Sequence, residues 1–190
     1  PTSPAFDETY LGNSGQLNTS LDGITWTTRT SSFAGTDTIH SVAYNNQGLW
    51  VAVGQDTGGN GKIAISPNGI DWTQYTSSFG TDPVFAVAGS KNLWVAVGGT
   101  TAVAGKVATS PNGTEWTQRA GGFGTTFVSA IAYNNKDLWV AAGASGKIAT
   151  SPDGTDWTQQ SATTFGADTI LDVIYDGNQW VAVGTTAKIA

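Results

Sequence analysis

The sequence predicts an all-β protein built from repeated four-stranded antiparallel units. Three observations carry this prediction. The chain of 190 residues contains 25 glycines, it is punctuated by short apolar runs such as residues 139–143, and one segment, residues 138–158, recurs with small changes along its length. An apolar run this short, rich in β-formers and closed by glycine, favours a buried strand over a helix.

The most regular part of each repeat is a turn with the sequence Ser-Pro-(Asn/Asp)-Gly, as at residues 151–154. Proline sets φ at the second turn position, Asn or Asp suits the third, and glycine accepts positive φ at the exit. We therefore expect a tight hairpin, with positive φ at the closing glycine. The residues assigned to this structural turn are Asp22, Gly23, Asn68, Gly69, Asn112, Gly113, Asp153 and Gly154.

Two series of tryptophans share one period. Trp26, Trp72, Trp116 and Trp157 recur about every 44 residues, and so do Trp50, Trp94, Trp139 and Trp180. A period in the low forties with four strand-like segments per copy is typical of a β-propeller. Because all eight tryptophans follow these series, we expect them to pack between blades and to be largely buried.

The predicted fold is therefore a β-propeller of four-stranded antiparallel blades, with about four blades present. Residues 1–9 are predicted to be a linker or frayed end, and residues 10–190 are predicted to form the propeller repeats. The blade-like copies cover residues 10–30, 37–76, 83–120, 127–160 and 169–190.

Two arrangements of the ends stay open. Residues 16–19 either pair with the strand that follows them, so that the chain is part of a longer propeller, or residues 188–190 pair with residues 24–27 and close a four-bladed ring. We favour the first, because Gln16 and Thr25 both lack charge whereas Lys188 matches the copies that bear an acid.

A possible ion pair recurs within the repeat. Three lysines are each followed nine residues later by an acid, and the first copy lacks both charges. This indicates a pair across the hairpin, although independent drift at two solvated positions is the alternative. The pairs are Lys62 with Asp71, Lys106 with Glu115, and Lys147 with Asp156.

Composition excludes several classes of function. The net charge is −6, so no basic surface is expected to follow a phosphate backbone, and nucleic acid is not expected as a partner. The absence of cysteine removes disulfides and thiolate metal sites. No apolar run is long enough to span a membrane and residues 1–10 do not form a signal peptide, so we expect a soluble chain without membrane insertion. No cofactor is expected.

The turn sequences at residues 66–72 and 151–157 resemble the Asp-box, or bacterial neuraminidase repeat, of sialidase-like β-propellers. The family pattern is roughly Ser-x-Asp-x-Gly-x-x-Trp, and here glycine directly follows Asp or Asn, one position early. The resemblance implies the non-enzymatic variety of these repeats, found in bacterial surface proteins, phage tail proteins and photosystem assembly factors. It also implies that the box is a folding element.

The resemblance does not extend to sialidase chemistry. Sialidases hold the substrate carboxylate with three arginines, and this chain has only Arg29 and Arg119. A lone His40 cannot build a metal site without partners. The loop acids Asp37, Asp82 and Asp168 occupy matching positions, which repetition alone explains. We therefore expect no enzymatic activity and no metal site.

The expected function is a non-catalytic recognition or display module on an extracellular, cell-surface or virion surface, such as a phage tail. It would bind a glycan or a protein through the loops that join successive blades and those between the second and third strands, within a larger chain or a homo-oligomer. The alternatives are a purely structural scaffold and an assembly factor for a protein partner. The candidate ligand-binding residues are Asp37, His40, Asp56, Asn60, Asp82, Phe85, Phe127, Asp168 and Asp172.

Overall fold

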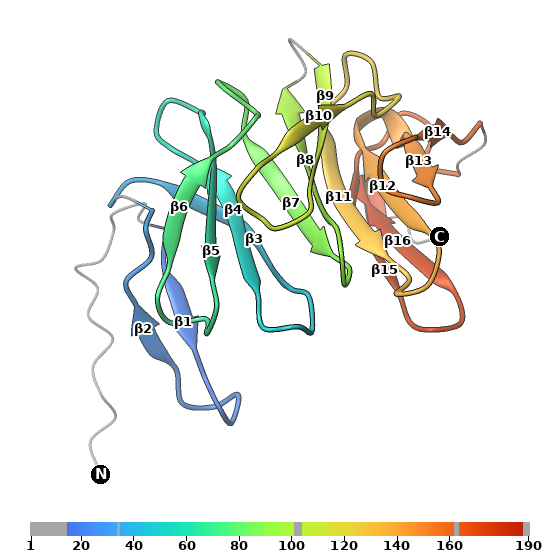
Figure 1. Cartoon of the computed structure of the whole chain (residues 1–190). Helices are drawn as coiled ribbons and strands as arrows, with labels where there is room; N and C mark the ends of the chain where they lie inside the picture. The colour runs from blue at the N-terminus through green and yellow to red at the C-terminus, as the bar shows by residue number, and fades with distance from the viewer. Residues whose placement is uncertain (1–14, 34, 101–103, 162–163, 188–190) are drawn as a thin grey trace.

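The computed structural model describes residues 15–33, 35–100, 104–161 and 164–187. Within these ranges the chain forms three complete four-stranded antiparallel sheets, each with its strands in sequence order (Figure 1). The first sheet contains β3 (Thr38–Tyr44), β4 (Trp50–Gln55), β5 (Gly61–Ser66) and β6 (Thr73–Thr76). The second contains β7 (Val84–Gly89), β8 (Trp94–Thr100), β9 (Ala104–Ser110) and β10 (Thr117–Arg119), and the third β11 (Val128–Tyr133), β12 (Trp139–Gly143), β13 (Ile148–Ser151) and β14 (Thr158–Gln159).

A two-stranded sheet lies at each end of this series. β1 (Leu17–Thr19) pairs with β2 (Thr27–Arg29), and β15 (Ile170–Tyr175) pairs with β16 (Trp180–Gly184). Two short 3-10 helices, η1 (Ala144–Gly146) and η2 (Thr185–Ala187), follow β12 and β16. The all-β prediction with four-stranded antiparallel blades is confirmed.

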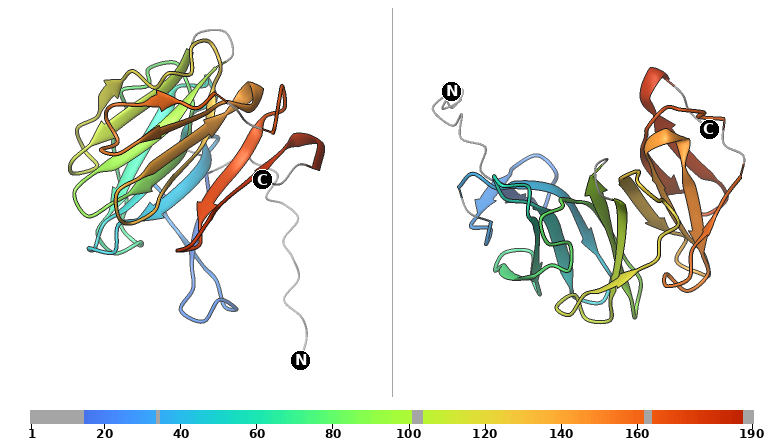
Figure 2. Two further views of the ribbon diagram at one scale, coloured as in Figure 1. Left: turned by 90° about the vertical axis from the view of Figure 1, so that its right-hand side faces the viewer. Right: turned by 90° about the horizontal axis from the view of Figure 1, so that it is seen from above.

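The five sheets follow one another along an open arc and do not close into a ring over the described residues (Figure 2). The predicted pairing of residues 16–19 with the next strand is present as β1 with β2, where Leu17 lies opposite Arg29. Residues 188–190, which would have closed a four-bladed ring, lie outside the described residues, as do most of residues 10–16 and all of the segment predicted as a linker.

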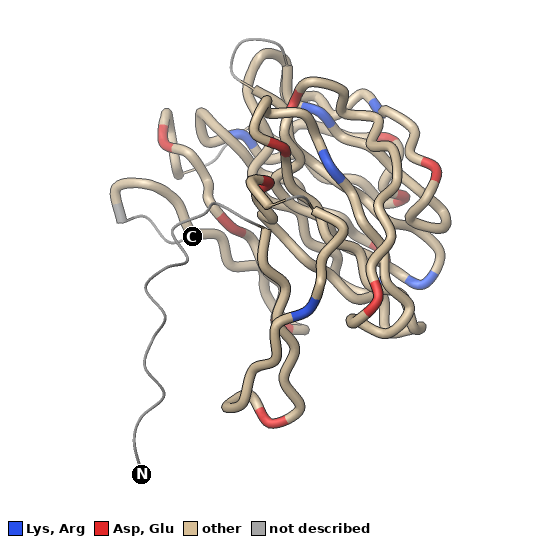
Figure 3. Tube along the Cα trace, turned by 90° about the vertical axis from the view of Figure 1, so that its left-hand side faces the viewer, with Lys and Arg blue, Asp and Glu red and all other residues tan. Residues whose placement is uncertain are grey.

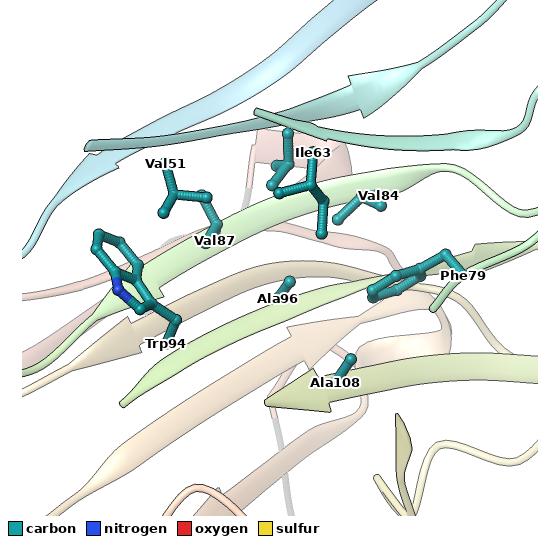
Figure 4. Close-up of a cluster of buried hydrophobic side chains, with 9 residues drawn as sticks. Val51, Ile63, Phe79, Val84, Val87, Trp94, Ala96 and Ala108 are labelled. Carbon is teal, nitrogen blue, oxygen red and sulfur yellow. The ribbon is translucent and has the colours of Figure 1, made fainter. Parts of the chain in front are cut away.

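The hydrophobic core lies between successive sheets, because each central strand is buried on both faces. In β8, Val95 and Val97 pack toward the third sheet, whereas Trp94 and Ala96 pack toward the first. Figure 4 shows the first of these layers, in which Val51 and Ile63 meet Val87 and Trp94. Burial on both faces explains why these strands read as continuous apolar runs.

The tryptophans are arranged as predicted, with one exception. Trp94 and Trp139 are 1% and 2% exposed, and five others are half-buried. Trp26 is 62% exposed. The two series therefore serve the core except at the first repeat.

The repeated turn has the predicted geometry. φ is +74° at Gly69, +81° at Gly113 and +76° at Gly154. In the turn after β13, Ser151 Oγ accepts a hydrogen bond from Gly154 N at 2.8 Å, and Asp153 Oδ1 accepts one from Asp156 N at 2.9 Å. The serine and the Asn or Asp of the motif therefore satisfy backbone amides that the turn would otherwise leave unpaired.

The four inner strands β3, β7, β11 and β15 each contain one residue outside the pairing register. In β3 the partners jump from Ile39 to Ser41, and in β7 they jump from Val84 to Ala86. The same shift occurs in β11 and β15. The four bulged residues are His40, Phe85, Ser129 and Leu171. A β-bulge redirects the side chain of the extra residue, so these four positions share one special orientation.

Candidate functional site

Three of the candidate residues from the sequence lie in contact, and we call them the aromatic row: His40, Phe85 and Phe127. The ring centroids of His40 and Phe85 are 5.3 Å apart with an interplanar angle of 62°. Those of Phe85 and Phe127 are 5.7 Å apart at 65°. Both contacts are edge-to-face, the arrangement that ring quadrupoles favour.

The aromatic row crosses three blades on the inner side of the arc. β3 contacts β7, β7 contacts β11 and β11 contacts β15, so the first strands of successive sheets lie side by side. His40 and Phe85 are bulged residues of β3 and β7, and Phe127 directly precedes β11. His40 is exposed, whereas Phe85 and Phe127 are half-buried. The His40 end of the row is therefore open to solvent, while the rings of Phe85 and Phe127 are held in place by packing.

The fourth inner strand extends the surface with an aliphatic side chain. Leu171, the bulged residue of β15, is 54% exposed. Between it and Phe127, Ser129 Oγ lies within hydrogen-bond distance of the carbonyl oxygens of Ala142 and Ile170, and its bond to Ile170 joins β11 to β15. The neighbouring candidate Asp172 is exposed, and its Oδ1 accepts a hydrogen bond from Val173 N at 2.8 Å.

The candidate loop acids have a different environment. Asp37 and Asp82 are only 3% and 4% exposed. Lys62 Nζ lies 2.8 Å from Asp37 Oδ2, and Lys106 Nζ lies 2.6 Å from Asp82 Oδ2. Their carboxylates are thus engaged by lysines of the same sheet. Asp168 occupies the corresponding loop before β15, and its carbonyl accepts a hydrogen bond from Gly146 N.

These ion pairs correct the prediction that Lys62 pairs with Asp71 across the hairpin. The β5–β6 register places Lys62 opposite Thr76, so Asp71 lies beyond its reach. Asp71 instead accepts a hydrogen bond from Asn68 Nδ2. Likewise, Lys106 pairs with Asp82 rather than Glu115, and Lys147 Nζ donates to the carbonyl of Phe123 rather than to Asp156.

The candidates Asp56 and Asn60 close their own loop between β4 and β5. Asp56 Oδ1 accepts hydrogen bonds from Gly58 N at 2.8 Å and Asn60 N at 2.9 Å, and both carboxylate oxygens accept from Asn60 Nδ2. The hydrogen bonds from Asn60 are the main reason why the pKa of Asp56 is lowered. Both side chains therefore stabilise their own loop and do not point toward the aromatic row.

One repeated element was not recognised from the sequence as part of this region. A phenylalanine in each loop that enters a new sheet is buried: Phe33, Phe79, Phe123 and Phe165. Lys106 Nζ and Lys147 Nζ each donate at 2.7 Å to the carbonyl of the phenylalanine in the loop entering their own sheet, Phe79 and Phe123 respectively. The recurrence of Phe-Gly or Phe-Ala before each first strand was the available signal. These two bonds hold the loops that enter β7 and β11, the strands that Phe85 lies on and Phe127 precedes.

A concavity lies at the end of the inner strands opposite the aromatic row. It has a volume of about 310 Å³ and is lined by the turns that follow β3 and β7 and by residues at and beyond the end of β11. Its lining includes Asn46, Gln47, Asn92 and Asn135, which are exposed and polar. Asn46 and Asn135 have φ of +58° and +59°, a conformation that asparagine tolerates in turns.

Charge is sparse and dispersed. In Figure 3 acidic and basic residues are interspersed along strands and turns and do not gather in one patch. Within the described ranges, no cluster of three His, Cys, Asp or Glu residues could hold a metal ion. No helix in that part of the chain is long and apolar enough to cross a membrane.

Similar structures place this fold in the β-propeller class. No protein-family model matches the sequence, and no curated protein matches it. The structure is similar to YCF48 from Cyanidioschyzon merolae, with a TM-score of 0.67 and 14% identity over 93% of this chain and 63% of that one. It is also similar to YCF48 bound to D1 peptide, with a TM-score of 0.64 and 16% identity over 93% of this chain and 57% of that one.

A designed protein shares the architecture. The computationally designed Ika4 protein matches with a TM-score of 0.60 and 14% identity, over 83% of this chain and 91% of that one. The chain thus spans nearly the whole length of Ika4 but less than two thirds of either YCF48 chain. At these identities the similarity shows the fold.

Proposed function

We propose that this protein is a non-catalytic recognition module that binds a segment of a protein partner through the aromatic row. The observation that carries the proposal is the continuous contact of His40, Phe85 and Phe127 across three blades. Rings that are held by packing at their base and open at one end lose little conformational freedom when a ligand binds. The ligand class that such a surface fits is a peptide with apolar or aromatic side chains.

The residues around the aromatic row favour a ligand with apolar side chains over a ligand with charged groups. Leu171 continues the apolar surface, and the carboxylates of Asp37 and Asp82 already form ion pairs with lysines. A peptide with one or two large apolar side chains could therefore bury them without leaving a charge unpaired. The inner strands that carry the row contact one another, so they offer a continuous platform.

The similarity to YCF48 adds support of a second kind. One structure of that protein is described as bound to D1 peptide, and its fold is shared here. The proposal extends this kind of ligand to the present chain. The extracellular or virion setting implied by the Asp-box resemblance is part of the same proposal, as is the absence of catalysis.

The test is selection of linear peptides from a displayed random library on the immobilised 190-residue chain, followed by calorimetric titration of the enriched peptides. Phe85→Ala should weaken binding by roughly tenfold or more, because a central aromatic is removed. Tyr75→Ala, a half-buried aromatic change on the outer strand β6, is the matched control and should leave affinity unchanged.

Two results would overturn the proposal. One is failure of any peptide sequence to enrich, which would favour a structural scaffold. The other is enrichment of peptides whose affinity is the same for the wild type and for Phe85→Ala, which would place the binding surface elsewhere.

A further inference from the structure

The side chain of Trp26 departs from its counterparts in the later repeats. In the other three turns the indole Nε1 donates to the carbonyl of the turn glycine, at 3.1 Å for Trp72, 2.8 Å for Trp116 and 3.0 Å for Trp157. Trp26 Nε1 has no acceptor among the described residues, and its side chain is 62% exposed. The ring is therefore not engaged by its own turn.

Trp26 lines a groove of about 440 Å³ between β1 and β3. Gln16, Asn18 and Ser41 contribute polar groups to this groove, and Ile39 and Val42 contribute apolar surface. Ligand sites of small molecules begin at about 300 Å³, so the groove has room for one or two sugar rings. His40 also lines it and separates it from the rest of the aromatic row.

The amides of this groove replace the residues found at the same repeat positions elsewhere. Gln16 stands where the other copies have Lys62, Lys106 and Lys147. Asn18 stands where they have Ala64, Ala108 and Ala149, and those alanines are fully buried between sheets. An amide placed against an apolar sheet would lose its hydrogen bonds with water at a cost of about 1–3 kcal/mol. Asn18 is exposed, so its amide fits a face of β1 that contacts water or a polar ligand.

We propose that this groove, which shares His40 with the aromatic row, binds a neutral saccharide. The apolar face of a sugar ring would stack on the exposed face of Trp26. The side-chain amides of Gln16 and Asn18 each offer a donor and an acceptor to vicinal hydroxyls. Apart from His40, no described side chain that lines the groove can carry a charge, so these residues offer no partner to an acidic or basic sugar.

The experiment uses the full 190-residue chain and saturation-transfer NMR with maltose, cellobiose, lactose and N,N′-diacetylchitobiose, and with sialyllactose as the charged comparison. At least one neutral disaccharide should bind with a dissociation constant of about 10 mM or below. Trp26→Ala and Asn18→Ala should each weaken this binding by about tenfold or more. Asn18→Ala installs the residue present in the other copies, so the fold should be retained.

Gln74→Ala removes an exposed amide on β6, away from the groove, and should leave saccharide binding unchanged. Phe127→Ala removes the ring of the aromatic row that contacts Phe85, whereas Phe85 is the ring that packs on His40. This variant should also leave saccharide binding unchanged, which separates this proposal from peptide binding. The inference is overturned if no neutral disaccharide binds, if only sialyllactose binds, or if both Trp26→Ala and Asn18→Ala retain wild-type affinity while thermal unfolding shows them folded.

Discussion

Lys106 Nζ lies 2.6 Å from Asp82 Oδ2 and 2.7 Å from the carbonyl oxygen of Phe79, so one ammonium group joins β9 to the loop that enters its own sheet. Asp82 is buried, and Lys106 is partly buried. A buried carboxylate of this kind depends on its cation, because it has left bulk water.

Replacing Lys106 by Met should therefore destabilise the protein by roughly 2 kcal/mol, since Asp82 would keep its burial but lose its cation. Asp82→Thr is the matched variant, because Thr126 occupies the equivalent position in the next loop. There, the side-chain Nζ of Lys147 donates only to the Phe123 carbonyl among the described residues. Asp82→Thr should cost less than Lys106→Met. Urea unfolding measures the free energy of unfolding of both variants. Equal losses of stability would show that the Lys106–Asp82 ion pair contributes nothing specific.

Valine at Gly154 should be more damaging than valine at Gly23. Both glycines have positive φ, +76° and +73°, so each substitution carries backbone strain of about 1 kcal/mol. A Cβ at Gly154 would also lie 2.7 Å from Leu93 Cδ2, whereas a Cβ at Gly23 would meet nothing within 4 Å. Overpacking adds about 1–3 kcal/mol at Gly154 only. Thermal melts of the two variants should differ accordingly, and identical melting temperatures would contradict this reading.

Truncation of the tryptophans should separate the core positions from the exposed one. Trp139→Ala should lower the free energy of unfolding by about 3–5 kcal/mol, because the side chain is 2% exposed and packs between the second and third sheets. Trp26→Ala should change it by less than about 0.5 kcal/mol. Denaturant unfolding followed by far-ultraviolet circular dichroism makes the comparison. A large loss from Trp26→Ala would mean that its ring is covered in solution.

The turn carboxylate Asp153 should make stability depend on pH. Hydrogen bonds from the Thr155 hydroxyl, and then from the backbone amides of Asp156 and Thr155, lower the pKa of Asp153 below its ordinary value of 3.8. Since the folded pKa is the lower one, the stabilisation is present above the unfolded pKa and is lost as pH falls through the folded pKa. The loss should appear between about pH 5 and pH 2.

Asp153→Asn removes this titration, and Asn68 and Asn112 show that asparagine is accommodated at the same turn position. The variant should therefore lose less stability than the wild type between pH 7 and pH 3, as measured by urea midpoints at the two values. A wild-type decline that is unchanged in the variant would assign the acid sensitivity to other carboxylates.

The features that sequence predicted well are local. The sign of φ at Gly69, Gly113 and Gly154 follows from a four-residue turn, and the blade period follows from repetition. The lysine pairs were predicted wrongly because their partners depend on strand register and on a loop more than twenty residues away.

The candidate site was predicted only in part for a related reason. His40, Phe85 and Phe127 were named individually, but their contact depends on bulges and on the packing of separate blades. Trp26 could not be told from its seven counterparts by residue type. Its different environment was signalled only by Gln16 and Asn18, which replace Lys and Ala.

The bulges of the inner strands have a consequence for how the proposed recognition surface could be altered. Since His40, Phe85, Ser129 and Leu171 stand outside the ladder, their identities are not dictated by cross-strand pairing, and a histidine, a phenylalanine, a serine and a leucine already occupy equivalent places. His40, Phe85 and Leu171 thus stand at interchangeable positions on a constant frame, whereas the Ser129 hydroxyl links β11 to β15. A combinatorial library confined to these three residues would diversify ligand preference while leaving the hydrogen-bonded sheets as they are.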